Sequence, residues 1–388
     1  MNLLKPIFYD EFSCIGAECP LTCCAGWRIT IDDDTFKNYR KMGGKIASFA
    51  KKNMVYEERW HENKVQLKDN GLCPMLNDKQ LCEVVLCKGT KHLSQTCKIY
   101  PRETVHSFDT NELYLSLSCP RALELLFALG EKVKFVLEED EKLNLENIPV
   151  LNQELLINLK VREMVGDFIQ DADLPLWFRE FYSAYTIEKL SSEIKAKNFD
   201  GVVSKLSHLY ETSFYQAMYD GIKNTSVNRE QQFQSLCGTV NAFERSIRGA
   251  IFVDKYGYAK KIEELLMVNR QCTFDEWNHS RETWREQVDV LQQENMLVYN
   301  WMVFAFNFKQ ENMLLTNYIM TVLINILTNH LIILHGIKYE PDKQMEKVIA
   351  AFVVRTLQHG DDKIMKTVQM GMDENILSPT FLLCLCNL

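Results

Sequence analysis

The sequence predicts a mainly α-helical protein, with a loop-rich, cysteine-rich N-terminal domain at residues 1–125 and an α-helical bundle domain at residues 126–388. Two uneven distributions support this division. Nine of the 13 cysteines lie between Cys14 and Cys119, and six of the nine prolines lie at or before Pro149. In most of the remaining chain, apolar residues recur at three- and four-residue spacing, which is the helical period. A chain of 388 residues is long enough to bury a sizeable core.

The elements follow in chain order. Residues 28–31 fit a short strand, and a helix is expected to run to about residue 42, capped by Asp32, Asp33 or Asp34. Residues 113–117 fit a strand or a helix. Pro120 suits the first turn of a helix over 121–138, and 139–151 resembles a linker. Further helices are expected at 152–170, 176–196, 200–222, 228–268 with a break near Gly257, 274–294, 296–309, 311–336 and 342–357.

Composition and charge narrow the function and the compartment. A net charge of −8 argues against a dedicated nucleic-acid-binding protein. The first residues show no signal peptide. The apolar stretch 313–335 carries polar residues such as Asn325 and His330, so it predicts a buried bundle helix and not a membrane span. We therefore expect a cytoplasmic protein with no nucleic-acid or membrane partner. In that compartment, clustered thiols more often bind metal or do chemistry than form disulfides.

The cysteine pattern predicts a metal centre. Four thiols fall in the run Cys14-Ile-Gly-Ala-Glu-Cys19-Pro-Leu-Thr-Cys23-Cys24. Thiolate suits zinc or iron–sulfur clusters, and the CxxC knuckles typical of zinc are absent, so an iron–sulfur cluster is favoured with zinc as the alternative. A [4Fe-4S] cluster takes at most four cysteines, so either two centres or additional neighbouring thiols are implied. The candidate ligands are Cys14, Cys19, Cys23, Cys24, Cys73, Cys82, Cys97 and Cys119.

Five elements of residues 6–125 together resemble the FliB family of flagellin lysine-N-methylases, within a wider group that carries a zinc- or iron-chelating Cys-rich domain. They are the run from Phe12 through Cys14, Cys19, Cys23 and Cys24 to Trp27, then Cys73-Pro-Met-Leu, Leu81-Cys82, Thr96-Cys97-Lys-Ile-Tyr100-Pro101-Arg102 and Leu117-Ser-Cys119-Pro120. The resemblance implies methyl transfer from S-adenosylmethionine to surface lysines of flagellin, with a [4Fe-4S] cluster on the cysteine motif. Cys87 is additional to the family pattern and is not expected to be a ligand.

The residues themselves limit how a methyl donor could bind. The sequence has no GxGxxG turn and no CxxxCxxC motif. A cluster with three cysteine ligands would leave one iron open to the amino and carboxylate groups of S-adenosylmethionine. This hypothesis fails if cluster-free protein binds the cofactor equally well. Tyr100 and Arg102 are the candidate catalytic residues, and Trp27 and Arg102 the candidate cofactor-binding ones, with Arg102 able to hold a carboxylate by two hydrogen bonds.

Each of these roles has a structural alternative. Trp27 could instead cover the cluster, and Arg102 could form a structural ion pair. Glu103 is a candidate proton acceptor and Tyr114 a candidate pocket wall, whereas Asp32, Asp33 and Asp34 fit a helix cap better. The alternative function is a non-catalytic metal- or iron–sulfur-binding module whose helical domain docks a partner. A third is a zinc-stabilised helical scaffold.

Overall fold

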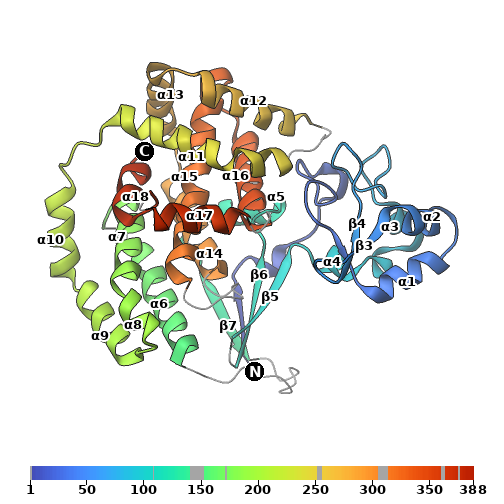
Figure 1. Ribbon diagram of the computed structural model, residues 1–388, viewed down its shortest axis with the longest axis horizontal. Helices are drawn as coiled ribbons and strands as arrows, with labels where there is room; N and C mark the ends of the chain where they lie inside the picture. The colour runs from blue at the N-terminus through green and yellow to red at the C-terminus, as the bar shows by residue number, and fades with distance from the viewer. Residues whose placement is uncertain are drawn as a thin grey trace.

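The computed structural model describes residues 2–107, 109–139, 153–170, 173–250, 256–304, 313–359, 363–374 and 376–388. Figure 1 shows a large helical body, with the cysteine-rich segment of short helices and strands on one side of it. A four-stranded mixed sheet, which includes the first strand of the chain, lies where the helical body meets the cysteine-rich segment. The prediction of a mainly helical protein is confirmed.

The N-terminal segment contains more regular structure than expected. One sheet in the described residues has the strand order β5 (Arg102–Ser107), β6 (Thr110–Leu115), β1 (Asn2–Pro6), β7 (Phe135–Glu139). A smaller one has the order β2 (Thr30–Ile31), β4 (Glu62–Val65), β3 (Met54–Glu57). Strands this short show only a few residues of alternation, and β1 pairs with residues more than a hundred positions away, so the sequence pattern of any one window is weak.

One predicted helix is wrong in its second half. Helix α5 (Pro120–Phe127) begins with Pro120 in its first turn, as expected, but ends well before residue 138. Residues 135–139 form β7 instead, because they pair antiparallel with β1 from Pro6↔Phe135 to Asn2↔Glu139. The ambiguous residues 113–117 begin in strand β6, so the strand interpretation holds there.

Short helices surround the strands of the N-terminal segment. Asp32 is the N-cap of the first, where its carboxylate accepts the Thr35 N–H at 2.8 Å. One of the three predicted capping residues is thereby identified. The bounds are α1 (Asp33–Lys41), α2 (Gly44–Asn53), α3 (Glu83–Lys88) and α4 (Gln95–Ile99).

Most predicted segments of the helical half are helical, but three of them are divided, and the helices Lys363–Asp373 and Pro379–Cys386 were not predicted. The segment 274–294 ends at Gln287, and the next helix begins at Val290 and not at 296. The segment 176–196 breaks at Leu190, and 200–222 breaks at Tyr210 and Glu211. Gly257 takes φ +75° before α12, which agrees with the predicted break. Apart from Glu139, the predicted linker lies outside the described residues. The bounds are α6 (Gln153–Ile169), α7 (Leu176–Lys189), α8 (Ser191–Lys195), α9 (Phe199–Leu209), α10 (Thr212–Ile222), α11 (Arg229–Ala250), α12 (Tyr258–Gln271), α13 (Phe274–Gln287), α14 (Val290–Phe304), α15 (Leu314–Lys338), α16 (Lys343–Gln358), α17 (Lys363–Asp373) and α18 (Pro379–Cys386).

Helix α15 forms the centre of the bundle. Among the described residues it is the one helix long and apolar enough to cross a membrane, and 89% of its most apolar window is buried within the protein. His330 accepts the Trp277 indole N–H at Nδ1 (3.2 Å) and places Nε2 3.0 Å from Asn269 Oδ1. Burial lowers the pKa of His330 to about 3, so the ring is neutral and fully bonded. It is a bundle residue, as its position in the apolar stretch predicts.

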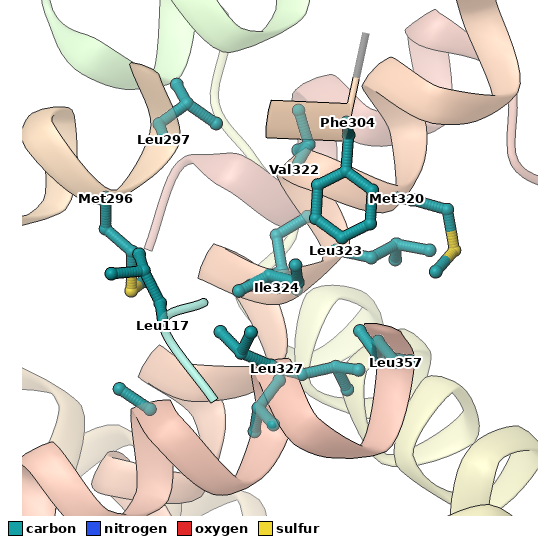
Figure 2. Close-up of a cluster of buried hydrophobic side chains, with 14 of the residues drawn as sticks. Leu117, Met296, Leu297, Phe304, Met320, Val322, Leu323, Ile324, Leu327 and Leu357 are labelled. Atoms are coloured by element: carbon teal, nitrogen blue, oxygen red, sulfur yellow. The ribbon is translucent and has the colours of Figure 1, made fainter. Parts of the chain in front are cut away.

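The core joins the two halves of the chain. Figure 2 shows Leu117, which follows β6, among side chains of α14, α15 and α16 such as Met296, Leu327 and Leu357. The same buried cluster includes Phe8 and Leu21 of the N-terminal segment. The predicted division at residue 125 therefore crosses a continuous core, and the division itself stays a prediction.

Candidate active site

Backbone hydrogen bonds bring the two cysteine groups together. The Cys73 N–H donates to the Cys24 carbonyl (2.7 Å), and the Gly26 N–H donates to the Gly71 carbonyl (3.1 Å). A β-bridge between Leu76 and Cys82 then turns the chain back beside Cys73. The loop that carries Cys19 to Cys24 is thus paired with the segment that carries Cys73 and Cys82.

Helix α4 adds Cys97 to the same region. Its N-terminus is held by Asp32, which accepts the Gln95 N–H at 2.8 Å while it also caps α1. The hydroxyls of Thr30 and Thr96 hydrogen-bond at 2.8 Å. Asp32 therefore acts as a structural cap that positions the Cys97 turn.

Cys23 is a common neighbour of five other thiols. In its thiolate form it would raise the pKa of Cys19, Cys73, Cys82, Cys97 and Cys119, so six of the eight predicted ligands share one electrostatic neighbourhood. Cys24 is next in the chain, and its thiol hydrogen-bonds Cys23.

The neutral form is favoured for Cys19, Cys23, Cys73 and Cys119. Burial raises the pKa of Cys19 and of Cys73 to about 12 and that of Cys119 to about 11. The hydrogen bond with Cys24, together with burial, raises the pKa of Cys23. Because a metal binds the thiolate, metal binding at this cluster would release protons and be favoured by higher pH.

The donor set has the right chemistry for a soft metal, but its geometry is not that of a closed site. Within the described ranges, no three Cys, His, Asp or Glu side chains converge closely enough to hold a metal ion. Cys14 is exposed, and its sulfur accepts the Gly16 N–H at 3.4 Å. Cys87 is also exposed and hydrogen-bonds Glu83. The ligand set and the identity of the metal both stay predictions.

Three rings meet beside Cys23 and form what we call the aromatic corner: Trp27, Tyr100 and His359. The Trp27 ring centroid lies 5.1 Å from that of Tyr100 and 5.2 Å from that of His359. The Trp27 indole N–H donates to the Cys23 carbonyl at 2.5 Å. Trp27 and Tyr100, which the sequence predicted as site residues, are therefore neighbours, and the bundle contributes the third ring.

A hydroxyl chain continues from the aromatic corner. Ser118 Oγ lies 3.0 Å from the Tyr100 hydroxyl, 2.9 Å from His359 Nε2 and 2.7 Å from Ser116 Oγ. The Ser116 hydroxyl donates to Gln358 Oε1 at 3.0 Å, and it lies close enough to the Glu103 carboxyl to lower the pKa of that group. The hydroxyls thus run from the aromatic corner to the neighbourhood of Glu103.

Burial sets the protonation states along the chain of hydroxyls. It raises the pKa of Glu103 to about 7, close to neutral pH, although the Ser116 hydrogen bond partly opposes the rise. It lowers the pKa of His359 to about 4, and the nearby Arg355 guanidinium acts in the same direction. Burial raises the pKa of the Tyr100 phenol. At neutral pH, Glu103 is therefore the group best suited to take up or release a proton.

Arg355 of α16 ties the bundle to the cysteine loop. Its guanidinium donates to the carbonyls of Leu21 and Thr22 at 3.0 Å each and to the Ser118 carbonyl at 3.3 Å. The residue is only 2% exposed. Sequence reasoning missed both Arg355 and His359. The one available indication was a lone arginine within the apolar run Ala-Ala-Phe-Val-Val-Arg-Thr-Leu.

Arg102 contacts a different set of groups from Tyr100. Its Nη2 donates to the Phe12 carbonyl at 3.3 Å, and its guanidinium lies over the Phe12 ring, 4.9 Å from the centroid. Tyr114 belongs to strand β6 and is fully buried, and its hydroxyl donates to the Glu112 carboxylate. The predicted roles of Arg102 in catalysis and cofactor binding stay predictions.

A surface cleft of about 350 Å³ opens next to the cysteine loop. Pro20 and Pro120 in its wall directly follow Cys19 and Cys119. The remaining wall comes from Ile15, Glu18, Glu124, Tyr256, Tyr258, Gln344 and Lys347. This volume lies within the range of small-molecule sites.

Comparisons with known proteins identify the family. The model of the FliB lysine N-methylase C-terminal domain matches residues 162–385, more than half of the chain. The chain is 35% identical over 147 residues to the flagellar biosynthetic protein FliU of Salmonella muenchen, covering 86% of that protein. It is also 35% identical over 144 residues to the lysine-N-methylases of Salmonella typhimurium and Salmonella choleraesuis, and spans about a third (35%) of their length. No solved structure matches the chain.

The family match and the motif resemblance cover different parts of the chain. The resemblance covers the cysteine-rich segment, whereas the family model begins in α6 and includes Arg355 and His359. Because the family model matches more than half of the chain, and because the chain covers 86% of the FliU protein, the chain belongs to the FliB lysine N-methylase family.

Proposed function

We propose that the protein is a cytoplasmic protein-lysine N-methyltransferase that transfers methyl groups from S-adenosylmethionine to surface lysines of flagellin. Family membership and the flagellar and lysine-N-methylase names of its relatives support this function. The observation that carries the proposal is the meeting of His359 and Arg355 of the bundle with the loop around Cys23. Free thiols and the burial of α15 support a reducing, soluble environment.

The thiols around Cys23 are the proposed ligands of a [4Fe-4S] cluster, with zinc as the alternative. Bound there, the cluster would supply an iron that chelates the amino and carboxylate groups of S-adenosylmethionine, and that cofactor would supply the methyl group. The adjacent cleft of about 350 Å³ is the proposed route by which small molecules reach the centre. Arg355 favours negative charge at Cys19, Cys23 and Cys119, which suits a cluster held by thiolates.

The chain's own residues would prepare the lysine. A free lysine has a pKa near ~10.4 and is mostly protonated at neutral pH, so its ammonium group must lose a proton before the nitrogen can accept a methyl group. The three rings of the aromatic corner would exclude water and lower the lysine pKa by desolvation. Glu103, whose pKa is about 7, would take the proton through the hydroxyls of Ser116 and Ser118.

Anaerobic purification followed by a methyl-transfer assay tests this function. Iron and acid-labile sulfide of about four each per chain are expected, and mass spectrometry should show methylated lysines on flagellin after incubation with S-adenosylmethionine. Cys23→Ser should lose both the cluster and methyl transfer. Cys87→Ser is the matched control, because this thiol is exposed and lies outside the ligand set. A full cluster with no methyl transfer would favour the non-catalytic binding module, and zinc without sulfide would favour a scaffold.

A further inference from the structure

Two cysteines of the helical bundle form a pair that is separate from the proposed cluster ligands. Cys237 lies in α11, and Cys272 is the C-cap residue of α12. Their side chains hydrogen-bond each other. Both are free thiols, and both are half-buried. Two thiols from different helices are thus held in contact where a small solute can reach them.

Hydrogen bonds fix the backbone on both sides of this pair. The buried side chain of Asn269, in α12, donates from Nδ2 to the Cys237 carbonyl and to Asn241 Oδ1, at 3.2 Å each. Its Oδ1 lies 3.0 Å from His330 Nε2 of α15. Cys272 follows Asn269 by three residues, which is about one helical turn. The two helices therefore keep the register that brings the two sulfurs together.

The two thiols differ in how readily they lose a proton. The hydrogen bond with Cys237 lowers the pKa of Cys272, although burial opposes this change. The same hydrogen bond, together with burial, raises the pKa of Cys237. Cys237 therefore donates the hydrogen bond, and the Cys272 sulfur accepts it. Because the thiolate is the nucleophilic form of cysteine, Cys272 is the thiol that reacts first with an electrophile.

We propose that Cys237 and Cys272 form a redox-active dithiol, which a hydroperoxide such as hydrogen peroxide converts to a disulfide. The Cys272 thiolate attacks one peroxide oxygen and the O–O bond breaks, which gives a sulfenic acid on Cys272 and a hydroxide that takes up a proton. The Cys237 sulfur then attacks the Cys272 sulfur, the S–O bond breaks, and water leaves with the Cys237 proton. The two thiols lose two electrons and two protons in total, and hydrogen peroxide is reduced to two molecules of water.

The disulfide would join α11 directly to the end of α12. It would close a covalent ring around residues 238–271, which include Tyr256 and Tyr258 of the cleft beside the cysteine loop. Such a link restricts the unfolded chain, so oxidation should raise the melting temperature of the protein, and Cys237→Ser should lack this rise. The reaction requires neither the cluster nor S-adenosylmethionine, so this inference does not depend on the proposed function.

Peptide mapping of the full chain tests the proposal. Anaerobically purified protein is treated with hydrogen peroxide, the remaining thiols are alkylated, and the protein is digested with trypsin. Cys237 and Cys272 then lie on separate peptides, 230–245 and 271–281, each with one cysteine. These peptides should be recovered joined, with the sum of their masses less two hydrogens, and dithiothreitol should separate them. Recovery of the two peptides singly, whether alkylated or oxidised, would overturn the proposal.

Cys384 and Cys386 are the internal control for proximity. They lie two residues apart in α18, which places their side chains on different sides of the helix, so they should not join each other. A disulfide between them as abundant as that between Cys237 and Cys272 would show unselective oxidation and overturn the proposal.

Two single variants test the order of the two steps. Cys237→Ser keeps a hydroxyl that can donate to Cys272 and removes the thiol that resolves the sulfenic acid, so dimedone should label Cys272 after peroxide treatment. Cys272→Ser should give roughly tenfold less labelling at Cys237, because that thiol keeps its proton. Equal labelling in the two variants, or stronger labelling of Cys237, would overturn the assigned roles.

Discussion

Replacing Arg355 by methionine should release the cysteine loop from the bundle. Methionine keeps a straight side chain of similar length, so packing loss is limited and the main change is the loss of the guanidinium donors. Four hydrogen bonds would disappear: two at 3.0 Å to the carbonyls of Leu21 and Thr22, one at 3.3 Å to that of Ser118 and one at 3.5 Å to that of Ala25. Hydrogen bonds to charged groups contribute about 1.5–3 kcal/mol each, and they are not additive.

We therefore expect local destabilisation of about 3–5 kcal/mol, a large share of the roughly 5–15 kcal/mol that stabilises a typical protein. A change of about 3 kcal/mol corresponds to more than a hundredfold in the population of the open loop. The assay is alkylation of the buried Cys119 thiol in metal-free protein, followed by mass spectrometry. Alkylation should become at least roughly a hundredfold faster in Arg355→Met.

Arg248→Met is the control for this experiment. Its guanidinium is 39% exposed and paired with Glu244 and Glu263, so its loss should change stability by less than about 1 kcal/mol. Alkylation of Cys119 in that variant should match the unmodified protein. If Arg355→Met also left the alkylation rate within about threefold, a factor worth less than 1 kcal/mol, the loop would not depend on this contact and the reasoning would be refuted.

Three further predictions concern single groups. Folding lowers the pKa of His330 from 6.5 to about 3, so between these pH values the unfolded chain binds one more proton than the folded protein. The free energy of unfolding should therefore fall by about 2 kcal/mol from pH 6.5 to pH 5. Denaturant titrations of His330→Gln should lack this pH dependence. Arg162→Met should lower the free energy of unfolding by about 3–5 kcal/mol in the same titrations, because it removes the guanidinium that pairs with the buried Glu112 carboxylate at 2.6 Å. The double variant with Glu112→Leu should recover most of that loss, and a failure to do so would contradict this account. Under the proposed function, methyl transfer should rise with pH through about 7 as Glu103 loses its proton, and Glu103→Gln should lower the rate roughly a hundredfold and flatten the profile.

The sequence was informative where the relevant contacts are local. Asp32 caps α1 through a contact three residues away, and the apolar period located α15 and α16 to within a few residues. Strand β7 was missed because its partner, β1, lies at the other end of the segment. A run such as Lys-Phe-Val-Leu-Glu can continue a helix or form a strand, and only the non-local pairing decides between them.

The candidate site shows the same limit. Spacing alone indicated that the cysteines would gather, but it ranked eight thiols equally, whereas the fold makes Cys23 a neighbour of thiols such as Cys73 and Cys119 and leaves Cys14 exposed. Trp27 and Tyr100 were predicted from motifs near the cysteines. His359 and Arg355 lie more than 230 residues from the loop they contact, and one basic residue in an apolar helix does not identify its partner.

The contact made by Arg355 joins the cysteine loop to the bundle as one structural unit. The carbonyls of Leu21 and Thr22 need donors when buried, and the described loop takes them from α16 and not from its own segment. A fragment ending at residue 125 would leave those carbonyls without this donor and Trp27 without the His359 ring. The cysteine motif and the C-terminal family domain therefore point to the same place in the fold, since the second supplies the groups that hold the first.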